Sequence, residues 1–280
     1  MLGKLIKYDM RSISRAFIPL WILAPIVSLL FGLSANATFS DDNSMLYGLF
    51  LSLGGDVLTT VVSVLFFSIL IALSVLTLLF IIQRFWKGLL KEEGYLAFTL
   101  PVETWQLIMG KAVSALLVSV VSALVALISF VFLVLCMKEL HWLFSWVGEA
   151  FRSMFLENPV WWCTMAVLAI LLFLFATVSN IYRLYAAMAL GQLFENHRGI
   201  GAFASYLGIS VALSALTGIL GAIFTLILAA FDLQWIEALL EQSKIFGIVV
   251  MIALILWAAV ETAVYHILTE WILSTKLNLE

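Results

Sequence analysis

The sequence predicts an all-α, polytopic membrane protein with six transmembrane helices, and three observations support this prediction. Hydrophobic residues make up 64% of the 280 positions and charged residues only 11%, whereas soluble domains have about 45–50% apolar and about 25% charged residues. The apolar residues gather in six runs, and about 20 helical residues cross the hydrocarbon core of a bilayer. Most basic residues fall in the connecting segments on one predicted side of the membrane. A soluble fold could not bury this much apolar surface.

One membrane domain is expected over 1–280, because the spans of a polytopic protein pack into a single bundle. The net charge of −3 and the lack of a basic tract give no indication of nucleic-acid binding. The two cysteines, Cys136 and Cys163, are expected at the outer ends of two spans. They could form a disulfide, but the simpler interpretation is that each is a small apolar side chain.

Residues 1–16 predict an amphipathic helix that lies in the membrane interface. Its basic residues are three or four positions apart, so they share one helical stripe that faces anionic lipid. They are Lys4, Lys7, Arg11 and Arg15. The region also resembles the start of a signal peptide with a cleavage site at 35–37, but the apolar run over 17–34 is longer than the usual ~7–15 residues. We expect 17–34 to be the first span, kinked at Pro19 and Pro25.

The other five spans follow from the remaining apolar runs. The fourth run continues to Phe194, so the span either stops near Arg183 before an interfacial helix or extends into the cytoplasm. The outer segment 137–159 mixes aromatic and charged residues, which predicts a helix among the headgroups or a small binding platform. Gly218 and Gly221 could allow close helix packing in the fifth span. The expected spans are about 57–83, 112–136, 160–183, 201–231 and 246–273.

The distribution of basic residues predicts that both chain termini are cytoplasmic. Eleven of the fourteen Lys and Arg residues lie in the segments assigned to the inner side, and cytoplasmic segments are enriched in these residues. An even number of spans also requires both termini on one side, so the two arguments agree.

Residues 84–111 form the longest polar interruption of the sequence, with four basic and three acidic residues. They also carry large apolar residues outside the predicted spans: Trp86, Leu89, Leu90, Tyr95, Leu96 and Phe98. Two interpretations remain open. The segment is either an interfacial helix on the lipid, or a short helix that binds a groove of a soluble partner, with charged residues at the rim setting its register.

The chain resembles the six-span permease subunits of ABC-2 type transporters, in particular the Firmicutes-type family. Glu93-Gly94, Leu100-Pro101-Val102 and Gly110-Lys111 resemble the cytoplasmic loop between the second and third spans of these exporters. The stretch 185–194 followed by His197-Arg198 resembles the end of their fourth span, and 276–280 resembles their tail. One departure is the outer segment 232–245, which is shorter than in many ABC-2 exporters.

This resemblance implies a bacterial, multi-pass protein of the cell membrane that works as a homodimer or heterodimer of permease subunits. It also implies outward transport driven by a separate ABC ATPase subunit, which would bind ATP and dock on a short cytoplasmic coupling helix. The residues implied in this coupling are Lys91, Glu92, Glu93, Gly94, Tyr95, Leu96, Phe98 and Thr99. The substrate is not indicated, although the few charged residues inside the spans favour a lipid-like or amphipathic cargo.

The sequence contains no HExxH, GxGxxG, Walker GxxxxGK[ST] or GxSxG motif. We therefore expect no catalysis by this chain, and no cofactor in it, because another chain would have to bind ATP. Two other classes remain as alternatives. One is an ATP-independent carrier or channel, and the other is an integral membrane enzyme that acts on lipid.

Four ionisable residues inside the predicted spans are candidate functional residues: Glu261, Arg183, His266 and Glu270. A charge at the centre of a span costs about 2.5–3.5 kcal/mol on insertion scales, so it normally faces a partner or a wet cavity. His266 and Glu270 are four positions apart and share a helix face, whereas Glu261 lies on the opposite face from Glu270. The three do not converge on a metal site. Glu261 is expected to act in function, to make a structural hydrogen bond or to pair with Arg183, and Glu270 to lie at the interface.

The topology can be tested by labelling single cysteines in a cysteine-free background. Asn43→Cys should react with an impermeant reagent added outside intact cells, and Glu195→Cys should react only after permeabilisation. The positive-inside distribution of Lys and Arg is the reason for this expectation. Labelling of Asn43→Cys only after permeabilisation would contradict the topology.

Overall fold

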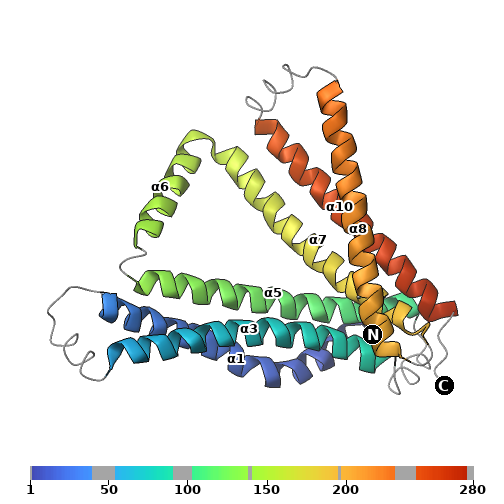
Figure 1. The fold of residues 1–280 in the computed structure, drawn as a ribbon, viewed down its shortest axis with the longest axis horizontal. Helices are drawn as coiled ribbons and strands as arrows, with labels where there is room; N and C mark the ends of the chain where they lie inside the picture. The colour runs from blue at the N-terminus through green and yellow to red at the C-terminus, as the bar shows by residue number, and fades with distance from the viewer. Residues whose placement is uncertain are drawn as a thin grey trace. The chain divides into compact units, whose positions relative to one another are not determined.

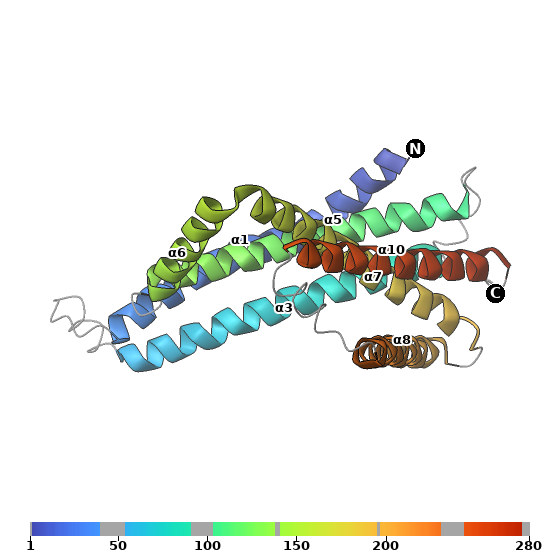
Figure 2. The same cartoon turned by 90° about the horizontal axis from the view of Figure 1, so that it is seen from above.

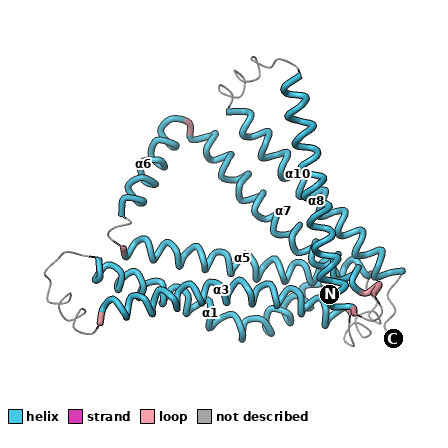
Figure 3. The backbone as a smooth tube through the Cα atoms, viewed as in Figure 1, coloured by secondary structure: helices cyan, strands magenta, loops and turns pink. Residues whose placement is uncertain are grey.

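The computed structural model describes residues 2–39, 54–90, 103–137, 141–194, 197–230 and 244–275, and nearly all of these residues are helical (Figure 3). Six helices of this part are long and apolar enough to cross a membrane. A helix satisfies its backbone hydrogen bonds internally, which hydrocarbon requires. The predicted fold class is therefore confirmed. In chain order the helices are α1 (Leu2–Phe39), α3 (Gly55–Leu89), α5 (Thr104–Cys136), α6 (His141–Glu157), α7 (Pro159–Gly191), α8 (Arg198–Ala230) and α10 (Lys244–Thr275), as labelled in Figure 1.

Several helices extend beyond the spans expected from hydropathy. The N-terminal segment and the first span form one helix, α1, with Pro19 and Pro25 inside it. The fourth span begins at Pro159 and continues past Arg183 to Gly191, so no separate interfacial helix follows Arg183. The second span continues to Leu89 and the third begins at Thr104. Much of the polar segment 84–111 is therefore the ends of two long helices.

One compact unit contains α1, α3 up to Ile81, α5 from Val113, and α6. Its helices α1, α3 and α5 lie side by side (Figures 1 and 2). Ser122 of α5 accepts hydrogen bonds from Trp21 Nε1 at 3.1 Å and from Thr77 Oγ1 at 3.2 Å. One hydroxyl thus links three helices beside the first of two apolar clusters in this unit, against which Trp21 itself packs. The buried members of these clusters are Phe17, Leu73 and Val118 in one, and Val27, Phe66 and Leu133 in the other.

The helix α6 confirms the prediction of a helix between the third and fourth spans. Its side chains Trp142, Trp146 and Phe151 are exposed. Amphipathic aromatic side chains are enriched where a membrane meets water, so this exposure fits a helix among the headgroups.

The second compact unit contains residues 82–112 and 158–280. Here α7 packs against both α8 and α10. The buried part of α7 is its C-terminal half, where Tyr185 is fully buried and stacks on the buried Phe85 of α3, with ring centroids 4.1 Å apart. Ile108 of α5 is also fully buried. The ends of α3 and α5 are thus packed parts of this unit.

The helices α7 and α8 approach each other most closely at the turn that joins them. A Cβ atom added to Gly191 would lie 2.5 Å from the backbone nitrogen of Ala202. An added Cβ at Gly208, Gly218 or Gly221 would meet no described atom within 4 Å. The close packing considered for Gly218 and Gly221 is therefore found at Gly191 instead.

Replacing Gly191 by alanine should destabilise the protein, because a backbone atom blocks the new methyl group. Overpacking of this kind costs typically about 1–3 kcal/mol. The measurement is the unfolding midpoint of the purified chain in detergent. The matched control is Gly208→Ala, where the space is open and stability should be unchanged or higher by up to about 1 kcal/mol. Equal behaviour of the two variants would contradict the close approach.

Candidate functional site

The strongest candidate site is an ion pair between two membrane-spanning helices of the second unit. Glu261 lies near the midpoint of the span Phe246–Thr275, and Arg183 lies in the C-terminal third of α7. Charged residues at this depth normally pair with each other and often mark a transport pathway. Two of the three interpretations of Glu261 are present, the pairing with Arg183 and a hydrogen bond to another helix.

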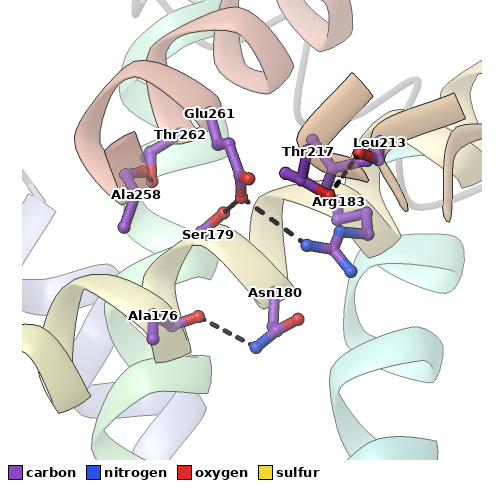
Figure 4. A network of polar contacts seen from close by, with 9 residues as sticks. All are labelled: Ala176, Ser179, Asn180, Arg183, Leu213, Thr217, Ala258, Glu261 and Thr262. Atoms are coloured by element: carbon purple, nitrogen blue, oxygen red, sulfur yellow. Dashed lines mark hydrogen bonds and ion pairs between the residues drawn. The ribbon is translucent and has the colours of Figure 1, made fainter. Parts of the chain in front are cut away.

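Ser179 and Arg183 both contact the same oxygen of Glu261, as Figure 4 shows. Ser179 Oγ donates a hydrogen bond of 2.8 Å to Glu261 Oε2. Arg183 Nη2 lies 3.6 Å from this oxygen, which is longer than the 2.7–3.2 Å of a normal N–H···O bond. The serine holds the carboxylate, and the arginine supplies its counter-charge at a longer distance.

Arg183 also lies over the ring of Tyr265, with 5.9 Å between the guanidinium carbon and the ring centroid. This distance is within the range of a cation–π interaction. Its Nε atom is buried and has no hydrogen-bond acceptor among the described residues. The side chains of Arg183 and Glu261 are 19% and 12% exposed. The arginine thus contacts Glu261 and Tyr265, and its Nε donor is unused within the described residues.

The other two candidate residues form a separate contact on the same helix. His266 Nε2 lies 3.8 Å from Glu270 Oε2, so these residues share a face as predicted. The His266 and Tyr182 rings, on α10 and α7, pack in a T-shaped arrangement with centroids 5.3 Å apart. The side chain of Glu270 is 38% exposed and lies near the end of α10. Glu261 instead pairs with Arg183, so the three residues do not converge.

Neighbouring polar side chains do not join the Glu261 cluster. Asn180 donates to the carbonyl oxygen of Ala176, Thr217 to that of Leu213 and Thr262 to that of Ala258 (Figure 4). These bonds stay within single helices. In the described ranges, no group of three or more His, Cys, Asp or Glu side chains could hold a metal ion. The site is therefore a small cluster of Ser179, Arg183, Glu261 and Tyr265.

Two members of this cluster, Ser179 and Tyr265, were absent from the sequence-based candidates. Ser179 lies four positions before Arg183, and Tyr265 lies four positions after Glu261. Residues at this spacing share a helix face, so a search of the faces that carry the two charges would have found both. The residues implied in ATPase coupling, from Lys91 to Thr99, lie outside the described ranges.

Comparisons with protein-family models, with curated proteins and with solved structures gave no match. The function proposed below is therefore argued from the residues of this chain and from the geometry of its second unit.

Replacing Glu261 by glutamine should destabilise the protein far more than the same change at Glu270. Removing one partner of a buried ion pair costs about 3–5 kcal/mol because the remaining charge loses its counter-ion, whereas an exposed pair contributes about 0–1 kcal/mol. The measurement is chemical unfolding of the purified variants in detergent.

The double variant Arg183→Gln with Glu261→Gln is the control for this experiment, because it leaves no unpaired charge. It should recover part of the stability that Glu261→Gln loses, as expected for coupled residues. Strictly additive losses from the two single substitutions would show that the two charges do not interact.

Proposed function

We propose that the chain is the membrane-spanning permease subunit of an ABC-2 type exporter, driven by ATP on a separate ATPase subunit. In this proposal it acts in a bacterial cell membrane as a dimer of permease subunits. One observation carries the proposal. The helix ends on either side of the charged connection 91–102 belong to the same compact unit as the Arg183–Glu261 pair.

The contacts within this unit offer a route from the connection to the ion pair. Phe85, at the end of α3, stacks on Tyr185 of α7. Tyr185 lies two residues after Arg183 on the same helix, and Arg183 faces Glu261 of α10. A force on the connection would reach α7 through a stack of two fully buried rings. A contiguous packed network of this kind is a physical means of coupling two sites.

The composition of the connection supports a protein partner. Residues 91–99 combine Lys91, Glu92 and Glu93 with the large side chains of Tyr95, Leu96 and Phe98. Aromatic side chains in desolvated pockets dominate many protein interfaces, and charges at the rim direct association. Because the sequence has no Walker motif, such a partner would have to supply the bound ATP.

A second candidate function is an ATP-independent carrier. The observation that favours it is the ion pair near the centre of α10, since polar groups at the midplane are typical of transporter binding sites. The two candidates differ in one measurable property. Only the exporter subunit should copurify with an ATPase from the membranes of its own cells.

If 94–99 binds an ATPase, then Tyr95→Ala and Phe98→Ala should each lower the affinity for that ATPase by about thirtyfold, and less of it should copurify. This corresponds to about 2 kcal/mol, the loss expected for a truncated aromatic anchor. The measurement is a pull-down with each variant at matched membrane expression.

The control for the pull-down is Trp142→Ala. Trp142 is an exposed aromatic residue of α6, in the segment predicted on the outer side, and its loss should leave the ATPase bound. Unchanged binding in both the Tyr95 and the Phe98 variant would favour an interfacial helix on the lipid and would contradict the exporter assignment.

A further inference from the structure

A hollow of about 270 Å³ lies between α8 and α10 in the second unit. Its walls are mostly apolar, with Leu213 and Leu216 on α8 opposite Trp257, Glu261 and Tyr265 on α10. Glu261 is the charged residue among those that line it. Pockets for small molecules are usually apolar with a few polar groups that set the orientation of the ligand, and their volumes start near 300 Å³. At about 270 Å³ the hollow lies just below this range, so it suits a small ligand with a largely apolar body.

Three residues of α10 give this hollow its chemical character. Trp257, Glu261 and Tyr265 follow each other at intervals of four positions, so they form one stripe along the helix. The stripe places a carboxylate between two aromatic side chains. Aromatic rings attract cations through the negative charge on their faces, and quaternary ammonium ligands are recognised by aromatic residues. The wall of the hollow thus carries the groups that bind an organic cation.

Arg183 of α7 does not line the hollow, but it already serves two of the lining residues, Glu261 and Tyr265, as a cationic partner. Its guanidinium lies over the Tyr265 ring at 5.9 Å and 3.6 Å from the Glu261 carboxylate. It contacts both groups without a normal hydrogen bond to the carboxylate, and its Nε lacks an acceptor in the described part of the chain. A cation that approaches from the hollow would meet a carboxylate that Ser179 and Arg183 both contact through Oε2.

We propose that this hollow binds a small hydrophobic monocation, such as an aryl or alkyl ammonium ion, with Glu261 as its counter-ion and Arg183 as its internal competitor. The ligand's apolar body would pack on Leu213 and Leu216. A free cation fits better than a lipid headgroup, because Glu261 lies near the middle of its span and lipid ammonium groups lie at the interface. Binding does not depend on an ATPase partner, so it goes beyond the proposed export function.

Two water-soluble probes of similar size and opposite charge test this proposal: phenyltrimethylammonium and benzenesulfonate. They are titrated by calorimetry into the purified full chain in dodecylmaltoside, an uncharged detergent without an ammonium group. The cation should bind saturably and the anion should not. Equal binding of both probes, saturable binding of the anion alone, or no binding of the cation would overturn the proposal.

Two matched glutamate variants then locate the site. Glu261→Gln should abolish binding of phenyltrimethylammonium, whereas Glu270→Gln removes the same charge from the same helix outside the hollow and should leave the affinity unchanged. Arg183→Gln should raise the affinity, because the internal cation is gone. Retained binding in Glu261→Gln would overturn the assignment.

A third variant keeps the test decisive if Glu261→Gln fails to fold. Trp257→Leu leaves the ion pair in place and removes one aromatic face, and it should weaken cation binding by about tenfold. An unchanged affinity in this variant would exclude the stripe as the site. None of these outcomes alters the ATPase pull-down, so failure of this proposal and failure of the export function are distinguishable.

Discussion

The second unit depends on the requirement that a charge inside a membrane be neutralised. Glu261 lies where water cannot solvate it well, and Arg183 of another helix provides its counter-charge. The pairing brings one face of α7 to one face of α10. Ser179 adds a directed bond to the same oxygen, so the two helices are set in rotation as well as in distance. Apolar packing alone is a weak guide in lipid, where the tails are as apolar as the side chains.

The first unit shows how little polarity is needed to set helix packing in such an environment. Ser122 links α1, α3 and α5 through two hydrogen bonds, and one of its partners, Trp21, also packs against an apolar cluster. The second unit uses charge and stacked aromatic rings instead. Apart from groups near helix ends, the titratable groups of the described spans therefore lie in the second unit. The ends of α3 and α5 belong to the same unit.

The hydropathy of the sequence was sufficient to predict six helices, because hydrocarbon permits few other backbone conformations. The helix ends were predicted less well. The extensions of α3 to Leu89 and of α5 from Thr104 bury residues such as Phe85 and Ile108 within the second unit, and hydropathy along one chain segment does not report such packing. The pairing of Arg183 with Glu261 remained one of three interpretations, because it depends on which helices are neighbours. The hollow is formed by residues of both α8 and α10, so the sequence of either helix alone does not predict it.

The long α7 has a consequence for the way the protein is made. Arg183 precedes Glu261 in the chain and is synthesised first, so for a time this arginine lacks its glutamate partner. Its place in the C-terminal third of α7 allows the long side chain to reach the headgroup region during this interval. Insertion of α10 then brings the carboxylate. A glutamate near the middle of a span cannot reach the headgroup region in this way. Because Arg183 comes earlier in the chain, its positive charge is present when Glu261 is synthesised.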